Sequence, residues 1–324
     1  MYTFENIVGH NDIKIRLQQS IKKARVSHAY VFVGEKGAGK KTIAYTFAKT
    51  LQCINQQENP CSSCISCKTF ETLNHPDIIY FTPEKATIGT EDVRDIIKEI
   101  NLRPNGDYKK IIIIDKCHKL TIAAQNTILK TLEEPTSYSI IIFITESINN
   151  FLDTILSRVV VMRLGPVQDE YALSYISNKY QIDDQLASFY VAYARGNIGL
   201  LDKLIKDENF INLRKSAINF LIELDEKAIN DVFLSYKFIE EHKNLQNDLF
   251  DIMQIFLRDC IVLKNNGEVL QKDIKNIIAS YIKDIDTSTL IKKFEIVMFA
   301  RNMLNYNTNF QMTIEIMLLR LRAA

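Results

Sequence analysis

The chain has 324 residues, of which 47% are hydrophobic and 24% charged, and its formal net charge is +1 at pH 7. This length and composition can build two or three domains with full apolar cores, and the near-neutral charge argues against a protein whose whole surface binds nucleic acid. The N-terminus lacks the apolar stretch of a signal peptide, and the longest apolar runs are too short to cross a bilayer. We therefore expect a cytoplasmic protein without membrane contact, in which disulfides are not expected.

Residues 1–165 alternate short apolar runs with helical patterns, which is typical of a parallel α/β sheet. Strands are predicted at 29–34, 77–83, 109–115, 139–147 and 159–164, and helices at 40–52, 90–102, 121–134 and 149–158. The run KKIIIID at 109–115 is almost continuously apolar, as expected of a strand buried on both faces. Pro135 ends the third predicted helix because it cannot continue the hydrogen-bond ladder.

Gly165 and Pro166 end this alternation, and the rest of the chain has only helical periodicity. Three short helices are predicted in 166–207, the middle one at 183–194, and longer helices separated by polar turns in 208–324. The sequence thus predicts an α/β plus all-α chain with a sheet domain at 1–165, a small helical domain at 166–207 and a larger one at 208–324.

A glycine-rich loop follows the first predicted strand and precedes the first predicted helix. Gly34, Gly37, Gly39 and Lys40 fit the phosphate-binding pattern G-x-x-x-x-G-K-[ST]. In such a loop the backbone N–H groups and the helix N-terminus surround phosphate oxygens, and the lysine reaches the outer phosphates. The alternative is a glycine-rich turn without a ligand, which the strand–loop–helix context disfavours.

The next position of this pattern holds Lys41, which cannot ligate Mg²⁺. A Ser or Thr there ligates Mg²⁺ in nucleotide hydrolases, but this chain has Lys41, whose ammonium would repel the ion. Thr42 comes one residue late, and a step of about 100° along the helix should turn its side chain away from the metal. We therefore predict that Mg²⁺ is not held in the usual way.

A second departure follows the third predicted strand. Asp115 ends this buried run, where a Walker B motif carries its metal-associated carboxylate, although it can also be read as a simple strand end. In an active motor the residue directly after this Asp is a Glu that activates the attacking water, and in this chain that position holds Lys116. Hydrolysis by this chain is not expected, while weak nucleotide binding by the glycines and Lys40 remains open.

Four cysteines lie close together in the sequence, at Cys53, Cys61, Cys64 and Cys67, in the spacing C-x₇-C-x₂-C-x₂-C. Four thiolates at short spacing in an intracellular chain predict a structural zinc site. An iron–sulfur cluster and unligated thiols are the alternatives, but the further Cys followed by Pro that ferredoxins carry is absent. Cys117 and Cys260 are isolated and are expected to be ordinary core or surface residues.

Several segments together resemble the delta-prime family of bacterial DNA polymerase III clamp-loader subunits, within the AAA+ class. The matching segments are FENIVGH at 4–10, SHAYVFVGEKGAGKKT at 27–42, the four cysteines, HPD at 75–77, KKIIIIDKCHKL at 109–120, NTILKTLEEP at 126–135, TILSR at 154–158, ARGNIGLL at 194–201 and NYNTNFQMTIEIMLLRL at 305–321. The resemblance implies an AAA+ core with an inserted zinc module at 53–67, a three-helix lid and a helical collar that packs into a ring with sibling subunits.

The resemblance also implies roles for single residues. Ser157 and Arg158 match a Ser-Arg-Cys motif whose arginine acts in trans on ATP bound by a neighbour, with Val159 replacing the Cys. Thr145 occupies the sensor 1 position, and Gly199 stands where active siblings carry a sensor 2 arginine. These matches imply a non-catalytic stator that binds ATP weakly or not at all and belongs to the DNA-directed DNA polymerase holoenzyme.

The implied partners are the gamma/tau and delta subunits and, through the assembled complex, the sliding clamp and primed DNA at the nucleoid-associated replisome. An authentic ATP-hydrolysing subunit of the gamma/tau type is the alternative, which Lys41 and Lys116 disfavour. A zinc-dependent nucleic-acid-binding module is a third reading, disfavoured by the near-neutral charge and by a cysteine cluster without interleaved aromatic residues.

Overall fold

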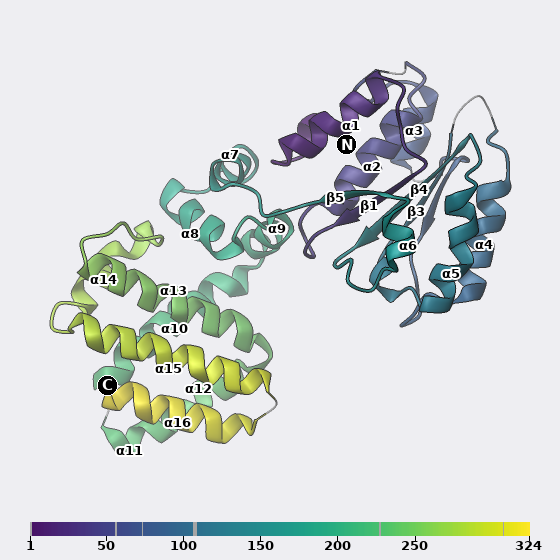
Figure 1. The fold of residues 1–324 in the computed structure, drawn as a ribbon. Helices are drawn as coiled ribbons and strands as arrows, with labels where there is room; N and C mark the ends of the chain where they lie inside the picture. The colour runs from purple at the N-terminus through teal and green to yellow at the C-terminus, as the bar shows by residue number, and fades with distance from the viewer. Residues whose placement is uncertain (1, 56, 73, 106–108, 227, 307) are drawn as a thin grey trace. The chain divides into compact units, whose positions relative to one another are not determined.

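The computed structural model describes residues 2–55, 57–72, 74–105, 109–226, 228–306 and 308–324 (Figure 1). Its sheet has five parallel strands in the order β2-β3-β4-β1-β5. The strands are β1 (Ala29–Val33), β2 (Ile78–Phe81), β3 (Lys110–Ile114), β4 (Ser139–Thr145) and β5 (Val160–Arg163). All five predicted strands are confirmed to within a few residues at their ends.

This strand order decides where the candidate site lies. β4 pairs with β3 on one side and with β1 on the other, and Val33 at the end of β1 is in register with Thr145. Because parallel strands end at the same edge of a sheet, the glycine loop after β1, Asp115 after β3 and Thr145 at the end of β4 come together.

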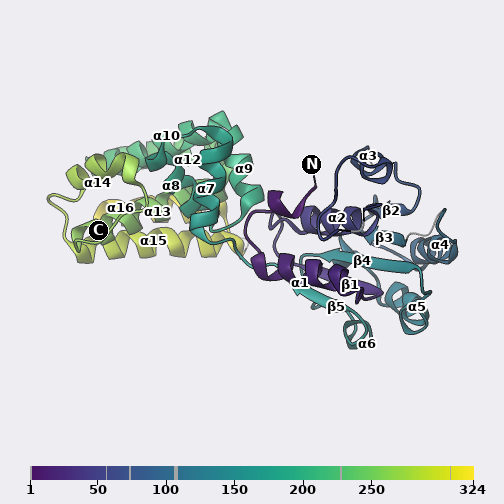
Figure 2. The ribbon, with the colours of Figure 1, turned by 90° about the horizontal axis from the view of Figure 1, so that it is seen from above.

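Helices cover both faces of the sheet (Figures 1 and 2). One apolar layer joins the sheet to α1 (Asn11–Lys22), α2 (Lys40–Leu51) and α3 (Ile65–Glu71). The other joins it to α4 (Thr90–Asn101), α5 (Ile122–Glu133) and α6 (Asp153–Leu156). Two 3₁₀ helices lie at Phe4–Asn6 and Cys117–Lys119. The helices α1 and α3 were not predicted from the sequence.

The prediction of a helix at 149–158 was wrong in its extent, because α6 starts only at Asp153. The reason is a buried side chain on α5. Gln125 accepts a hydrogen bond from the Leu152 N–H at 2.8 Å and donates one to the Asn150 carbonyl at 2.6 Å. These backbone groups therefore bond to Gln125 instead of to a helical turn, and Leu152 keeps an extended conformation with ψ of 141°.

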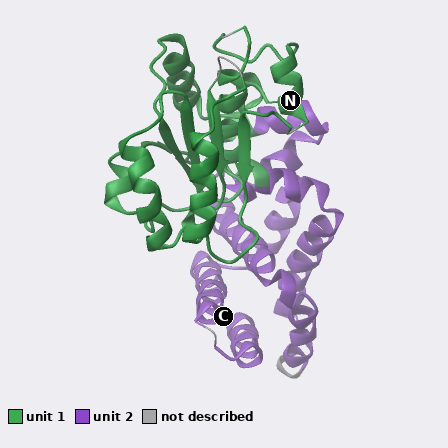
Figure 3. Cartoon of the chain, turned by 90° about the vertical axis from the view of Figure 1, so that its right-hand side faces the viewer, with its two compact units in different colours: residues 1–172, 196–199 green, residues 173–195, 200–324 purple. Residues whose placement is uncertain are grey.

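The chain divides into two compact units, residues 1–172 with 196–199 and residues 173–195 with 200–324 (Figure 3). The domain limits 165/166 and 207/208 stay predictions. After β5 the elements are α7 (Asp169–Tyr180), α8 (Asp184–Ala194), α9 (Ile198–Lys206), α10 (Glu208–Glu226), α11 (Ile229–Val232), α12 (Tyr236–Glu241), α13 (Gln246–Lys264), α14 (Lys275–Tyr281), α15 (Thr287–Asn305) and α16 (Phe310–Ala323), with 3₁₀ helices at Phe233–Ser235, Lys243–Leu245 and Lys272–Ile274. No helix in the described ranges is both long and apolar enough to cross a membrane.

Aromatic packing surrounds a buried arginine in the second unit. Phe189 stacks on Phe210 with ring centroids 6.1 Å apart, and the Arg214 guanidinium lies 3.8 Å from the Phe189 centroid. Arg214 is buried and makes a two-pronged ion pair with Asp273, with Nη1 to Oδ2 at 2.6 Å and Nη2 to Oδ1 at 2.8 Å. This geometry suits a buried arginine, because it satisfies several N–H donors at once.

Candidate functional site

A cavity of about 400 Å³ opens at the sheet edge where the glycine loop, Asp115 and Thr145 meet. The residues lining it are Lys36, Gly37, Gly39, Lys40, Lys41, Thr42, Asp115, Lys116, His118, Ile144, Thr145, Glu146 and Gly199. The structure thus brings together all the predicted nucleotide-site residues except Gly34. Four lysines face two carboxylates, so the cavity favours anions.

Gly34 serves the loop in another way, because a side chain at this position would clash with Leu164, which follows the neighbouring strand β5. A Cβ there would lie 2.6 Å from the Leu164 carbonyl oxygen. Gly37 and Gly39 have φ of 91° and 85°, a left-handed conformation that favours glycine. The sequence pattern therefore reflects real backbone requirements of the turn between β1 and α2.

The Lys40 ammonium is folded back onto its own loop. It is buried and donates to the carbonyl oxygens of Gly34 and Glu35, both at 2.6 Å. Burial lowers the pKa of Lys40, while the nearby carboxylates Glu146, Asp115 and Glu35 act in the opposite direction. Its ammonium is thus held beside the loop that would surround a phosphate.

Lys41 makes the contact that most distinguishes this site. Its Nζ lies 2.7 Å from Asp115 Oδ2, and the Asp115 side chain is only 10% exposed. Asp115 is the carboxylate expected to associate with Mg²⁺, and it already has a cation as its partner. The donor set therefore does not fit Mg²⁺, because an ammonium has no lone pair for the ion and repels it. Thr42 also lines the cavity. That its side chain turns away from the metal position stays a prediction.

Two further site residues lie where β3 and β4 end. Lys116 follows β3, and Thr145 is the last residue of β4. Lys116 is exposed, and its backbone is left-handed with φ of 53°. It lines the cavity at the position where an active motor carries the glutamate that activates water. Thr145 is buried, and its hydroxyl donates to the Ser147 carbonyl at 2.7 Å. The hydroxyl is thus engaged locally within the turn after β4.

A short segment of the first unit, residues 196–199, lies against the glycine loop. The Gly199 N–H donates to the Gly37 carbonyl at 3.0 Å, and Asn197 Nδ2 donates to the Lys36 carbonyl at 2.7 Å. A Cβ on Gly199 would lie 2.7 Å from the Gly37 Cα, so a side chain cannot be added without moving the loop. Asn197 was not predicted as a site residue, and only its place in ARGNIGLL pointed to it.

His10 is a second residue that the sequence analysis did not assign. Its Nε2 lies 3.1 Å from the Ala38 carbonyl, so the N-terminal segment contacts the glycine loop. Burial lowers the pKa of His10, and the neutral ring with a proton on Nε2 can donate to this carbonyl. The signal for it was the segment FENIVGH, in which it is the last residue.

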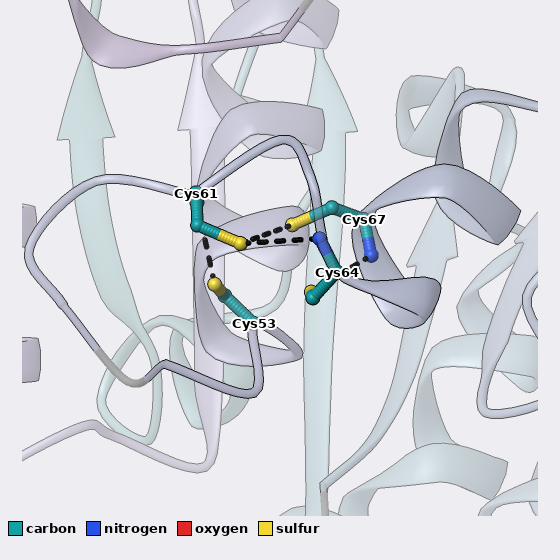
Figure 4. Close-up of side chains that lie close together, drawn as sticks. All are labelled: Cys53, Cys61, Cys64 and Cys67. Carbon is teal, nitrogen blue, oxygen red and sulfur yellow. Dashed lines mark hydrogen bonds between the residues drawn. The ribbon is translucent and has the colours of Figure 1, made fainter.

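The four predicted metal ligands are brought together by the loop after α2 and the first turn of α3 (Figure 4). The Sγ atoms of Cys53, Cys61, Cys64 and Cys67 all lie within 4.8 Å of one another, and those of Cys61 and Cys67 are 4.0 Å apart. Tetrahedral zinc with thiolates at 2.3 Å requires sulfur atoms about 3.8 Å apart, so this arrangement can hold a metal ion of that size. Backbone N–H groups point at Sγ atoms three residues back, from Cys64 to Cys61 and from Cys67 to Cys64, both at 3.4 Å.

The protonation of these thiols is uneven. Hydrogen bonds from Ser63, followed by that from the Cys64 N–H, lower the pKa of Cys61 to about 5. Burial raises the pKa of Cys53 and of Cys67. Cys117 and Cys260, in contrast, are fully buried core residues, as the sequence allowed. Cys61 is therefore a thiolate at neutral pH, whereas Cys53 and Cys67 must lose protons when a metal binds.

The cysteine cluster is tied to the helix that starts at the glycine loop. Lys49 near the end of α2 is fully buried, and its Nζ lies 2.5 Å from Glu71 Oε1 and 3.2 Å from Ser62 Oγ. Ser62 belongs to the loop between Cys61 and Cys64, and Glu71 ends α3. The charge of Lys49 is thus neutralised within the module, which fixes both segments against α2.

Arg158 follows α6 on the first unit, away from the glycine-loop cavity. Its Nη1 donates to the Thr154 carbonyl at 2.8 Å and to Ser157 Oγ at 3.1 Å, and its Nη2 lies 2.9 Å from Glu133 Oε1. The side chain is 36% exposed and lines a second, open cavity. Arg158 therefore belongs to a different part of the surface from the residues that line the glycine-loop cavity.

Comparison with known proteins assigns the chain to a family. Two family models, described as "DNA polymerase III, delta subunit" and "DNA polymerase III, delta subunit, C terminal", match residues 9–168 and 208–323. DNA polymerase III subunit delta' of Bacillus subtilis is 27% identical over 94% of this chain and 94% of its own. A subunit gamma of Buchnera aphidicola is 26% identical over 98% of this chain and 94% of its own, and subunit tau of B. subtilis is 27% identical over 81% of this chain and 50% of its own. The chain therefore belongs to the delta-prime family of DNA polymerase III clamp-loader subunits.

Proposed function

We propose that this chain is a non-catalytic stator of the clamp loader, which completes the ATP site of a neighbouring subunit and hydrolyses no ATP itself. The observation that carries the proposal is the 2.7 Å ion pair between Lys41 and Asp115. In an active site the same two positions would share Mg²⁺. Here a protein cation takes the place of the metal, and the carboxylate has no free charge to attract one.

Three further features support the absence of turnover. Lys116 offers no carboxylate to activate water, and an ammonium cannot act as the base at neutral pH. Gly199 carries no arginine, and its close approach to Gly37 leaves no room for one. Lys40 is occupied by two loop carbonyls, so a phosphate would have to displace them. Nucleotide binding by this chain is therefore proposed to be weak or absent.

Arg158 is the residue proposed to act on the neighbour's ATP. Its guanidinium is partly exposed on the first unit, where an incoming phosphate can reach it. A planar guanidinium can bind two phosphate oxygens at once and stabilise the charge that develops during phosphoryl transfer. Val159, in place of the family's Cys, is half-buried and does not contact the reacting groups of this proposal.

The cysteine cluster is proposed to hold a structural Zn²⁺. Four thiolates fill all four positions around tetrahedral zinc, so the metal would supply stability and no chemistry. The partners proposed are the gamma/tau and delta subunits, with the sliding clamp and primed DNA engaged through the complex in the bacterial cytoplasm. Residues 1–165, 166–207 and 208–324 are proposed as core, lid and collar of this subunit.

The purified chain alone should release phosphate from ATP at background rate, and it should raise ATP turnover when added to an assembly of gamma- and delta-type subunits. A phosphate-release assay on both samples measures this. The similarity to gamma subunits supports the alternative of an ATPase, which predicts turnover by the isolated chain. Turnover of the isolated chain at the rate of a gamma subunit would contradict the stator proposal.

Lys41→Thr should make nucleotide binding dependent on Mg²⁺. The variant frees the Asp115 carboxylate and places a hydroxyl at the metal position, so we expect ATP affinity with Mg²⁺ to rise about tenfold or more, equal to about 1.4 kcal/mol. Isothermal titration with and without Mg²⁺ measures the effect, and phosphate release should stay at background because Lys116 remains. Lys36→Thr, in the same cavity, is the matched control and should gain no Mg²⁺ dependence.

A further inference from the structure

The guanidinium of Arg158 already has an anionic partner within its own unit. Glu133 Oε1 lies 2.9 Å from Arg158 Nη2, while Nη1 is held by the Thr154 carbonyl and by Ser157 Oγ. Both side chains of the ion pair are partly exposed, at 36% for Arg158 and 48% for Glu133. Any polyphosphate that uses this arginine must therefore compete with a carboxylate that is already in place.

Two different helices fix the geometry of this pair. Glu133 is the last residue of α5, and Leu132 beside it is buried in the apolar layer under the sheet. Arg158 follows α6, whose start is set by the hydrogen bonds of Gln125 on α5. The pair is thus aligned by the packing of α5 against α6 and does not depend on a long flexible loop.

The neighbourhood of the pair offers a built-in comparison. Glu133, Glu134 and Arg158 all line one open cavity of about 760 Å³, together with His28 and Ser157. Among the described ion pairs, Arg158 is joined to Glu133 and not to Glu134. The two adjacent glutamates therefore contribute the same charge to the cavity, but only one of them contacts the guanidinium.

The strength of such a pair suits a contact that must be released. An exposed ion pair changes an equilibrium by at most about fivefold, because water screens it and two long side chains must be ordered. A two-pronged arginine–phosphate contact in a water-excluded interface is stronger. The carboxylate can therefore hold the guanidinium in the free subunit, and a γ-phosphate can still replace it.

We propose that Glu133 is a positioning residue that holds Arg158 as its counter-ion until the γ-phosphate of a neighbour's ATP displaces it. This inference rests on the proposed function of Arg158. Because the competition occurs before the arginine reaches the phosphate, Glu133 raises the ATP concentration needed for turnover. It does not change the rate once the arginine is engaged.

The test is steady-state ATP turnover of the assembly with gamma- and delta-type subunits, measured over a range of ATP concentrations. Glu133→Gln keeps the size of the side chain and removes its charge, so we expect KM for ATP to fall two- to fivefold while kcat stays within twofold. Glu134→Gln removes the same charge one residue away and should leave both constants unchanged. Arg158→Ala, measured in parallel, tests the proposed function separately.

The outcomes separate the two ideas. A loss of turnover with Arg158→Ala and an unchanged or raised KM with Glu133→Gln would overturn the counter-ion role and leave the stator function standing. The same lowered KM with Glu134→Gln would also overturn it, because the effect would then be general electrostatics. Wild-type turnover with Arg158→Ala would remove the proposed function and the inference with it.

A second measurement works on the isolated chain and does not need assembly. Phenylglyoxal modifies accessible arginine side chains, and the ion pair with Glu133 holds the Arg158 guanidinium away from the reagent. Glu133→Gln should speed modification of Arg158 two- to fivefold, read by peptide mass mapping with the exposed Arg163 as internal reference. An unchanged rate at Arg158 would overturn the proposal even if the variant fails to assemble.

Discussion

Replacing Arg158 by Ala should lower ATP turnover about a thousandfold at the one site that receives it in the assembly. An arginine placed against the γ-phosphate accelerates phosphoryl transfer by about 10³ to 10⁵, because it stabilises charge that develops in the transition state. Total ATP turnover of the assembly should fall by the fraction that this one site contributes. Single-turnover phosphate release on the assembled complex separates the slow site from the unaffected ones.

Two further variants define what the arginine contributes. Arg158→Lys keeps the charge but loses the planar pair of donors, so it should restore only a small part of the rate. Arg163→Ala removes an exposed arginine at the end of β5, five residues along the chain, and should leave turnover unchanged. An Arg158→Ala assembly of unchanged subunit composition that hydrolyses ATP at the wild-type rate would refute the role in trans.

Removing the metal should be the most damaging change to the first unit. With free zinc a thousandfold above its Kd, binding contributes about 4 kcal/mol to the free energy of unfolding. Cys67→Ser should abolish the binding of one zinc per chain and lower the free energy of unfolding by about this amount. It should also open residues 53–67 to proteolysis. Metal analysis, denaturant unfolding and mapped proteolysis measure these three effects, and the helices of 208–324 should stay protected.

A matched cysteine distinguishes ligation from simple packing. Cys117 is also buried, and its thiol donates to the Ile114 carbonyl at 3.0 Å, a bond that a serine hydroxyl can make. Cys117→Ser should therefore keep one zinc per chain. Equal zinc content in Cys67→Ser and the wild type would contradict the metal site, as would fragments cut throughout the helical region after chelation.

The pH dependence of zinc retention follows from the same thiols. Cys61, with a pKa of about 5, is already a thiolate at neutral pH, whereas burial raises the pKa of Cys53 and Cys67. Zinc binding must release the protons of these thiols, so affinity falls as pH decreases, by about tenfold per pH unit for each displaced proton. The metal's contribution to stability is thus present at higher pH and lost on acidification.

The sequence by itself determined the fold class, the five strands of the sheet, the cysteine cluster and the segment that carries Arg158. These features are local, because strand and helix periodicity and ligand spacing can be read from neighbouring residues. It also marked Lys41, Lys116 and Gly199 as departures from an active site. The helix α3 was missed because seven residues beside the predicted metal ligands are too few to show a helical period, and α1 was missed although it spans 12 residues.

Only the tertiary structure decided how these departures act together. Lys41 and Asp115 are far apart in the sequence, and they form an ion pair because β4 lies between β1 and β3 and brings the strand ends to one edge. The contact of Gly199 with Gly37 and the pairing of Glu133 with Arg158 likewise join distant segments. Local patterns do not specify which strands or helices become neighbours, so the pairing of charges across them is fixed only when the chain packs.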